Sequence, residues 1–454
     1  MTSPRDIVER IWARDQTLWT GHDEGKWLGW LDEPWRMAED VELFLQFADS
    51  VVDRVDDVVL LGMGGSSLAP EVLKRTFRQE TFHVLDTTHP QAIRALESRL
   101  DLSRTLFVSA SKSGSTLETR SHTDYFWEKT GRNGDLFAAI TDPGSELEQL
   151  ARERAFAGVF PGEPTIGGRY SALSAFGMVP AALMGVDVAR LLERAQEMAD
   201  GCRLAEGNPG LELGLSLGEG WRDGRDKICM PDTPEGFGLW AEQLLAESTG
   251  KHGKGLVPAP GEPADGPDRQ AQELRLTGDY EVGQEFFRGE CATAVAGSIL
   301  EINPFDQPDV QSAKDKTKEV LASGGEPDVE PHGSVEELLA AAEPGDYVCI
   351  QAFVDPTAAA EERISRLVER ARAETGCVVT HGFGPRYLHS TGQLHKGGPP
   401  TGLFVQVVDD TGDELPIPNQ PFGFGKLIRA QAAGDFASLQ ERGRRIVRIR
   451  LEDV

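Results

Sequence analysis

The chain has 454 residues, a formal net charge of −28 and 39% apolar residues. This length predicts two or three domains, and the negative charge argues against nucleic acid or an anionic membrane as the partner. No apolar run reaches the roughly 18 residues of a membrane span. The first residues also lack the apolar segment of a signal peptide, so we expect a cytoplasmic protein.

The cysteine pattern agrees with that compartment. The chain has five scattered cysteines with no CxxC spacing, namely Cys202, Cys229, Cys291, Cys349 and Cys377. An odd number without paired spacing predicts neither a structural zinc site nor a disulfide framework. We therefore expect reduced thiols.

The N-terminal half of the chain divides into an arm and an α/β domain. Residues 1–48 read as a helical arm rich in tryptophan, which we expect to pack onto a domain surface. Within residues 49–206, helix-like stretches separate four β-like apolar runs, at residues 58–61, 82–85, 105–108 and 136–140. Strands that alternate with helices predict a parallel sheet covered on both faces.

The rest of the chain divides into two more units. Residues 207–322 contain two strand-like and two helix-like runs, at residues 227–230, 255–258, 237–248 and 285–301. A stretch rich in Gly, Pro and Glu at residues 322–333 suits a linker. Residues 334–454 have the order β-α-β-β-α-β, which predicts a ferredoxin-like α+β domain.

Three short motifs indicate a phosphate-bearing small molecule as the ligand. LGMGGSSL at residues 61–68 and SASKSGST at residues 109–116 each follow a β-like run and precede a helix-like run. Their small residues let backbone N–H groups and hydroxyls approach an anion at a positive helix end. GGRYS at residues 167–171 places an arginine among glycines.

Together with two later motifs, these segments resemble the signatures of the phosphoglucose isomerase family. The later motifs are QLLAESTGK at residues 243–251 and NPFDQP at residues 303–308, the latter followed by Lys314. All occur in the family's order between about residues 55 and 320. The chain is most similar to the isomerase half of bacterial transaldolase–phosphoglucose isomerase fusions, and STGQLHKGG at residues 390–398 resembles that subgroup.

The resemblance implies a fold and a reaction. The implied fold is α/β, with two sugar-isomerase domains of the flavodoxin-like parallel sandwich type ahead of the C-terminal domain. The implied reaction interconverts glucose 6-phosphate and fructose 6-phosphate through a cis-enediol, moving one proton between C2 and C1. It needs a base and a partner for the enediolate, and no metal or redox cofactor.

The resemblance also assigns residues. Glu247 becomes the base, Arg169 the stabiliser of the enediolate, and Lys314 a group at the ring oxygen. The predicted substrate-binding residues are Gly65, Ser66, Ser111, Lys112, Ser113, Thr116, Gln243 and Gln307.

One feature departs from the family. Its members carry a ring-opening histidine after the catalytic glutamate, often donated by a neighbouring subunit, yet no histidine occurs between Lys254 and Glu330. Three others, His252, His389 and His395, are candidates, and the sequence assigns the role to none of them. Ring opening by Lys314 with a water also stays open.

Several alternatives remain at this point. The same site could accept mannose 6-phosphate, since an enediol loses the configuration at C2, or the chain could be a non-catalytic sugar-phosphate sensor. A dinucleotide-dependent oxidoreductase is a weaker alternative, kept open by Asp86 about twenty residues after the first loop. Family members are usually dimers with shared sites, so a homodimer is expected. The C-terminal unit could close over the site, bind a partner or support a dimer.

Overall fold

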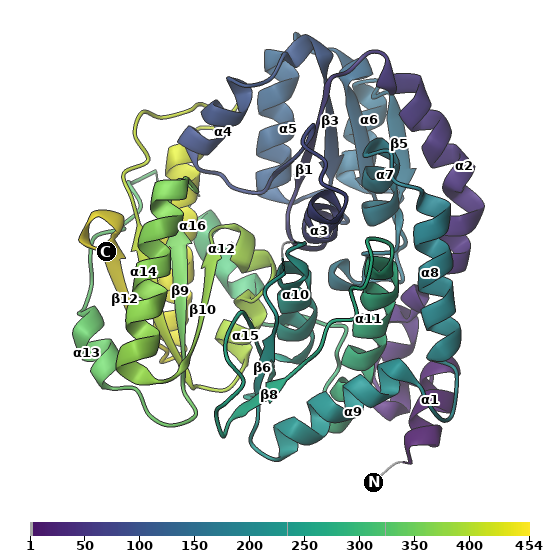
Figure 1. Ribbon diagram of the computed structural model, residues 1–454. Helices are drawn as coiled ribbons and strands as arrows, with labels where there is room; N and C mark the ends of the chain where they lie inside the picture. Colours follow the sequence, from purple (N-terminus) through teal and green to yellow (C-terminus); the bar gives the residue numbers. More distant parts are fainter. Residues whose placement is uncertain (1–2, 234, 323) are drawn as a thin grey trace.

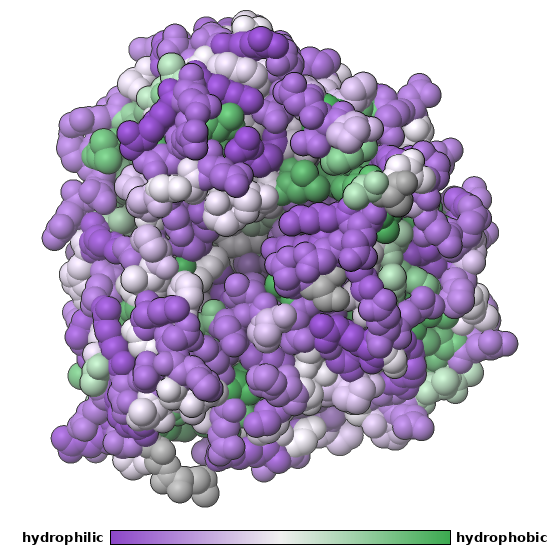
Figure 2. Space-filling view, turned by 180° about the vertical axis from the view of Figure 1, so that it is seen from behind, coloured by the Kyte–Doolittle hydropathy of each residue, from purple (hydrophilic) through white to green (hydrophobic). Residues whose placement is uncertain are grey.

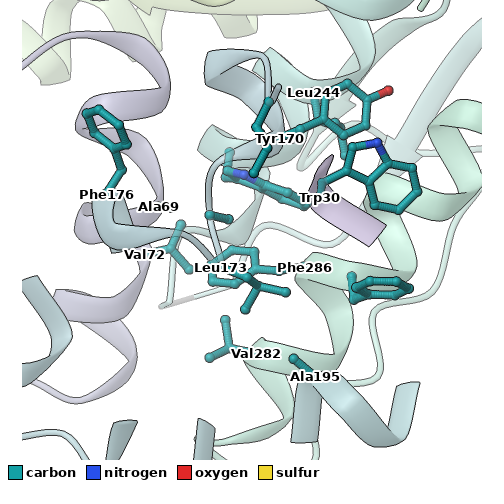
Figure 3. Packing of buried hydrophobic residues seen from close by; sticks show 14 of the residues in the cluster. Trp30, Ala69, Val72, Tyr170, Leu173, Phe176, Ala195, Leu244, Val282 and Phe286 are labelled. Carbon is teal, nitrogen blue, oxygen red and sulfur yellow. The ribbon is translucent and has the colours of Figure 1, made fainter. Parts of the chain in front are cut away.

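The computed structural model describes residues 3–233, 235–322 and 324–454, and the predicted N-terminal helical arm is present in it (Figure 1). The arm contains α1 (Pro4–Trp12) and α2 (Glu33–Val52). The indole of Trp19 donates to the Ala294 carbonyl at 2.9 Å, and Trp30 is fully buried against Tyr170 and Phe287. Figure 3 shows Trp30 within a cluster of apolar side chains from the rest of the chain.

The first domain contains the predicted parallel sheet. Its strands are β1 (Asp57–Gly62), β2 (Phe82–Leu85), β3 (Thr105–Ala110), β4 (Phe137–Thr141) and β5 (Gly158–Pro161). Their order, β2-β1-β3-β4-β5 with every pair parallel, is flavodoxin-like. The order reverses between β1 and β3, and ligands bind outside the carboxyl ends of strands at such a point. Both predicted phosphate-type loops begin there.

Six helices connect these strands or follow them. They are α3 (Leu68–Thr76), α4 (Pro90–Glu97), α5 (Leu117–Lys129), α6 (Glu146–Glu153), α7 (Ala175–Leu183) and α8 (Val188–Gly201).

A smaller parallel sheet follows, in the order β7-β6-β8. Its unit comprises α9 (Pro209–Arg222), β6 (Lys227–Met230), α10 (Phe237–Thr249), β7 (Val257–Pro260), β8 (Arg269–Ala271), α11 (Glu281–Leu300) and α12 (Gln311–Ala322). Helix α10 lies near the centre of the molecule, and α12 lies toward the C-terminal unit (Figure 1).

The C-terminal unit corrects one prediction, because its sheet is not ferredoxin-like. The unit comprises α13 (Val335–Ala340), β9 (Tyr347–Phe353), α14 (Ala358–Thr375), β10 (Val378–Phe383), α15 (Gly392–Gly397), β11 (Gly402–Val408), α16 (Phe424–Glu441) and β12 (Arg445–Arg450). The strand order is β10-β9-β11-β12, and all three pairings are parallel.

The physical reason lies in burial and connection length. A ferredoxin-like sheet is antiparallel with one face exposed, whereas β9 and β11 are buried at every residue, as is typical of a parallel sheet between helices. The segment between β10 and β11 is also long enough for a crossover, and parallel neighbours need a dozen or more connecting residues.

The units share buried surface. Cys229 and Ala246 of the second unit pack in one apolar cluster with Tyr347, Cys349 and Phe404 of the C-terminal unit. The domain limits at residues 48, 206, 322 and 334 stay predictions. All five cysteines are free and buried.

In the part of the chain that the structure describes, no helix combines the length and apolar character needed to cross a membrane. Figure 2 shows one face covered mainly by hydrophilic residues, in keeping with the net charge of −28.

Several single-turn 3-10 helices occur, three of which build the site. They are η1 (Gln16–Leu18), η2 (Glu24–Trp27), η3 (Gly29–Leu31), η4 (Gly64–Ser66), η5 (Leu102–Arg104), η6 (Gly134–Leu136), η7 (Gly168–Tyr170), η8 (Arg386–His389) and η9 (Leu451–Asp453).

Candidate active site

The loop after β1 contacts the arginine-bearing loop directly. Gly65 in η4 lies so close to η7 that a Cβ atom on it would be 2.0 Å from the Gly168 carbonyl oxygen. Gly64 has a φ of +56°, and a Cβ there would be 2.6 Å from the His389 carbonyl oxygen. Glycine therefore permits three chain segments to meet at Gly64 and Gly65. The predicted residue Ser66 lies in η4 and is buried.

The loop after β3 leads into α5, as an anion-binding loop requires. The hydroxyls of Ser111 and Thr116 are 2.9 Å apart, and the Gly114 N–H donates to Ser111 Oγ at 3.2 Å. Ser113 is exposed and lines a cavity of about 180 Å³ together with Thr116. Backbone and hydroxyl donors at the start of a 13-residue helix favour an anion.

Lys112 points elsewhere. Its ammonium donates to Asp142 Oδ1 and to the Glu163 carbonyl, each at 2.7 Å. The structure therefore pairs the charge of Lys112 with a carboxylate instead of presenting it to the cavity. Lys112 does not line that cavity.

Helix α10 presents Gln243 and Glu247 on one face, since they are one turn apart. The Gln243 amide donates to Glu247 Oε2 at 3.0 Å and to the His389 carbonyl at 2.9 Å. Its Oε1 atom is buried without a hydrogen-bond partner. A buried acceptor without a partner is costly, so this oxygen suits a substrate hydroxyl.

Hydrogen bonds fix the side chain of Arg169 next to Glu247. The guanidinium is buried and donates to Ser248 Oγ, to Gln307 Oε1 and to two backbone carbonyls, at 2.8 to 2.9 Å. Its Nη1 atom is 3.6 Å from Glu247 Oε1. An arginine has five N–H donors. The four hydrogen bonds fix the plane of the guanidinium, so its charge stays beside the Glu247 carboxylate.

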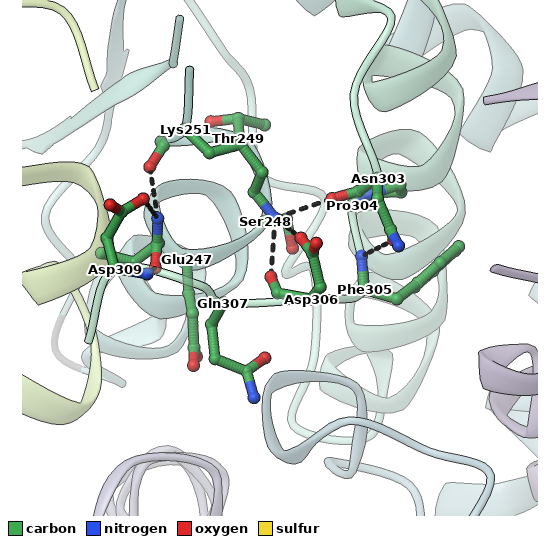
Figure 4. Close-up of polar contacts among 12 residues, drawn as sticks. Glu247, Ser248, Thr249, Lys251, Asn303, Pro304, Phe305, Asp306, Gln307 and Asp309 are labelled. Atoms are coloured by element: carbon green, nitrogen blue, oxygen red, sulfur yellow. Dashed lines mark hydrogen bonds and ion pairs between the residues drawn. The ribbon is translucent and has the colours of Figure 1, made fainter. Parts of the chain in front are cut away.

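The turn that accepts from Arg169 is itself held by Lys251. The ammonium of Lys251 donates to the Asn303 carbonyl at 2.7 Å and to the Asp306 carbonyl and carboxylate at 2.6 Å (Figure 4). Burial, and then the nearby charge of Arg169, lower the pKa of Lys251 to about 8. Figure 4 also shows the side chains of Glu247 and Gln307 pointing the same way.

Lys314 lies in the cavity with the phosphate-type loop. It is exposed on α12 and lines the same cavity as Ser113, Thr116 and His389. Sequence alone could not separate it from an ordinary charged helix surface, and its place in the cavity distinguishes it.

His389 is the residue that sequence reasoning left unassigned. It ends η8 in the C-terminal unit, and its Nε2 is 2.9 Å from Glu118 Oε1. Burial alone raises the pKa of the Glu118 carboxyl, but the charge of His389 and its hydrogen bond outweigh burial and hold that pKa at about 2. The side chain of His389 thus lines the cavity, and its backbone carbonyl accepts a hydrogen bond from Gln243.

The other two histidines lie outside this arrangement. His252 is exposed, with a φ of +56°. His395 is buried, with Nε2 3.5 Å from Cys349 Sγ and Nδ1 3.2 Å from Gln351 Nε2. Burial keeps the pKa of His395 well below its usual value.

The structure therefore brings most predicted residues into one region. Hydrogen bonds and the Arg169–Glu247 ion pair connect Arg169, Gln243, Glu247 and Gln307, and His389 joins this group to the cavity that contains Thr116 and Lys314. Ser248 and Lys251 belong to the motif at residues 243–251, and Glu118 follows the loop before α5, yet the sequence assigns a role to none of the three. These three side chains stand out in the structure because they are buried, and burial cannot be read from the sequence. Within the described ranges, no group of three or more His, Cys, Asp or Glu side chains has a metal-binding arrangement.

Known proteins resemble this chain in sequence. Residues 45–215 match the family model described as phosphoglucose isomerase. The glucose-6-phosphate isomerase of Gloeothece citriformis is 36% identical over 216 residues, covering 44% of this chain and 40% of that protein. That of Synechococcus sp. strain JA-3-3Ab is 32% identical over 289 residues, covering 54% of each. The chain thus spans about half the length, or less, of these relatives.

Solved structures resemble it in fold. A glucose-6-phosphate isomerase from Chlamydia trachomatis aligns with a TM-score of 0.53 at 19% identity, over 70% of this chain and 78% of that one. A hypothetical protein from Thermus thermophilus aligns with a TM-score of 0.50 at 21% identity, over 98% of this chain and 83% of that one. At these identities the likeness concerns the fold alone.

Proposed function

We propose that the chain, which resembles the phosphoglucose isomerase family in sequence, interconverts glucose 6-phosphate and fructose 6-phosphate through a cis-enediol, with Glu247 as the base. The supporting observation is that Glu247, Arg169 and Gln243 lie together, and that Gln243 also binds His389, which lines a cavity at the start of α5.

The phosphate binds at the start of α5 in this proposal. Ser113, Thr116 and the backbone N–H groups of the loop supply donors, and the helix end supplies partial positive charge. Ser111 supports the loop through its bond to Thr116. Lys112 contributes through Asp142 to the shape of the loop, since its ammonium is already paired.

The proton transfer needs a carboxylate that reaches both C1 and C2. Glu247 removes the proton from one carbon and returns it to the other, and Gln243 keeps its second oxygen in place. The fixed charge of Arg169 stabilises the negative oxygen that develops on the enediolate. Gln307, aligned by Arg169, and the free Gln243 Oε1 hold sugar hydroxyls.

Ring opening comes first, because the hexose phosphate is cyclic in solution. It requires a proton at the ring oxygen and removal of the proton from the anomeric hydroxyl. His389 is placed for one of these transfers and Lys314 for the other, since both line the cavity and Glu118 orients the imidazole.

The expected homodimer stays part of the proposal. Its site does not require the partner's histidine, since His389 comes from the same chain as Glu247.

The first experiment measures conversion of fructose 6-phosphate to glucose 6-phosphate in the presence of EDTA. Glu247→Gln should lower kcat by roughly 10²-fold or more, the contribution of a general base. The matched control is Glu242→Gln on the same helix. Glu242 lines a separate cavity and burial raises its pKa to about 8, so it is already protonated near neutral pH.

Activity that survives Glu247→Gln would refute Glu247 as the base. A wild-type protein that turns over neither hexose phosphate would refute the isomerase function itself and favour the sensor alternative.

A further inference from the structure

Helix α16 contacts α12, which carries Lys314, and it binds Glu118 and Tyr387 on either side of His389. It carries two buried polar residues, Gln431 and Asp435, one turn apart on one face. Buried polar side chains cost free energy unless their partners are fixed. The partners of Gln431 and Asp435 are Glu118, which binds the His389 ring, and Tyr387 and Lys396, which flank His389 in the chain. These contacts point to a role in positioning His389.

Gln431 holds the carboxylate that binds His389. Its Nε2 donates to Glu118 Oε1 at 2.7 Å, the same oxygen that meets His389 Nε2. Its own Oε1 accepts from the Thr88 hydroxyl at 2.7 Å, and Thr88 is fully buried. The amide is therefore fixed at both ends, and it fixes Glu118 in turn.

Asp435 holds the chain on both sides of His389. Its Oδ2 accepts from the Tyr387 hydroxyl at 2.6 Å, and its Oδ1 accepts from the Lys396 ammonium at 2.5 Å. The Asp435 and Lys396 side chains are 0% and 1% exposed. Buried ion pairs often add little net stability but specify one arrangement.

Between these two residues, Gly434 allows α12, the helix that carries Lys314, to pack closely against α16. A Cβ atom on Gly434 would lie 3.0 Å from the backbone nitrogen of Thr317 and 2.8 Å from its hydroxyl. Helix α12 therefore packs against α16 at a distance that only glycine permits.

We propose that α16 is a positioning helix for ring opening, in which Gln431 sets the Glu118–His389 pair and Asp435 sets the backbone that carries His389. This inference rests on the isomerase function proposed above and gives the C-terminal unit a role in it. Gln431 and Lys396 lie in the wall of the substrate cavity, but both ends of the Gln431 amide are bonded to Thr88 and Glu118, and Asp435 does not line that cavity.

The test isolates ring opening from proton transfer. An enzyme with Glu247→Gln cannot move the C2 proton but still opens and closes the ring, so it should interconvert the two anomers of glucose 6-phosphate. Exchange NMR measures that rate. Adding Gln431→Met should lower it by roughly tenfold or more, which is part of the 10²–10⁴ that a general acid contributes. The control Gln440→Met changes an exposed residue of α16 and should leave the rate unchanged.

Asp435→Asn alone would leave Lys396 buried and unpaired, so it is combined with Lys396→Met. The double variant should lower anomer exchange as Gln431→Met does, while its thermal midpoint reports whether the fold survives.

A second substrate separates positioning from general damage. A four-carbon aldose 4-phosphate cannot close a five-membered ring, because its O4 is esterified. With Glu247 intact, Gln431→Met should isomerise this compound as wild type does, while its kcat for glucose 6-phosphate falls. Unchanged anomer exchange, or an equal loss on both substrates, would overturn the positioning role. If the Glu247→Gln parent shows no anomer exchange and the wild-type chain converts no hexose phosphate, the isomerase function is overturned, and this inference with it.

Discussion

Gln243 connects the two halves of the candidate site through one amide group. Its nitrogen donates both to the carboxylate of Glu247 and to the backbone of His389. The proposed base and the proposed ring-opening histidine therefore share one anchor, and a shift of the Glu247 carboxylate or of the His389 backbone is transmitted to the other through two hydrogen bonds.

At this scale the sharpest prediction concerns the histidines. His389→Asn should lower kcat for glucose 6-phosphate by roughly 10²-fold or more, because a general acid–base group is lost. His252→Asn is the matched control, since His252 is exposed and has a positive φ that asparagine adopts readily. Steady-state assays of both variants check this, and a fully active His389→Asn enzyme would leave ring opening to Lys314.

At the scale of elements, η4 and η7 depend on each other. Gly65 in η4 lies against the backbone of Gly168 in η7, and η7 carries Arg169. A side chain at Gly65 must separate the two turns and move the guanidinium away from Glu247.

Gly65→Ala should therefore lower kcat/KM by roughly 10²-fold, the usual cost of about 1 Å of misplacement. Gly168→Ala serves as the control, because a Cβ atom at Gly168 has no heavy atom within 4 Å. Kinetics and thermal midpoints of the two variants should diverge. Equal effects would show that contact between the turns does not position Arg169.

For the whole molecule, the main consequence is that both proposed catalytic groups come from one chain. Helix α10 supplies Glu247, and η8 of the C-terminal unit supplies His389. A site shared between subunits would instead take these residues from different chains.

Mixing inactive variants distinguishes the two cases. If Glu247→Gln and His389→Asn chains are co-expressed, a within-chain site predicts no recovered activity. A shared site in a randomly mixed dimer predicts about a quarter of wild-type activity, because half of the dimers are mixed and each has one intact site. Coupled assays of the purified mixture measure this.

Buried carboxyls also give the molecule a pH dependence of stability. Glu290 is fully buried, neither of its oxygens has a partner, and burial followed by the charge of Glu33 raises its pKa well above the usual value. Burial, opposed by Arg36, raises the pKa of Glu33 to about 8. Above about pH 4.5 the unfolded chain ionises these groups while the folded chain holds the protons, so stability falls as pH rises toward 8.

Glu290→Gln should remove part of this loss. Relative to wild type, the stability of this variant should rise as the pH increases above about 4.5, with no gain below that pH. Thermal unfolding across that pH range measures the difference, and exposed Glu39→Gln is the control. A gain that is the same at every pH would mean that Glu290 is ionised in the folded chain.

Local pattern was enough for most elements. The apolar runs at residues 58–61, 82–85, 105–108 and 227–230 are the strands β1, β2, β3 and β6, because buried parallel strands need continuous apolar residues. The motifs also located Glu247, Arg169 and the loop before α5, since glycines and hydroxyls next to a helix start are local signals.

The sequence was therefore enough to predict the α/β class and the parallel first sheet, and its motifs carried the family resemblance from which the proton-transfer roles are proposed. The three-dimensional structure was needed to show that the C-terminal sheet is parallel, that Lys112 is paired with Asp142, and that His389 binds Glu118, 271 positions away in the chain. Strand direction and such distant contacts depend on how long connections cross over a shared core. No local pattern of residues records that path.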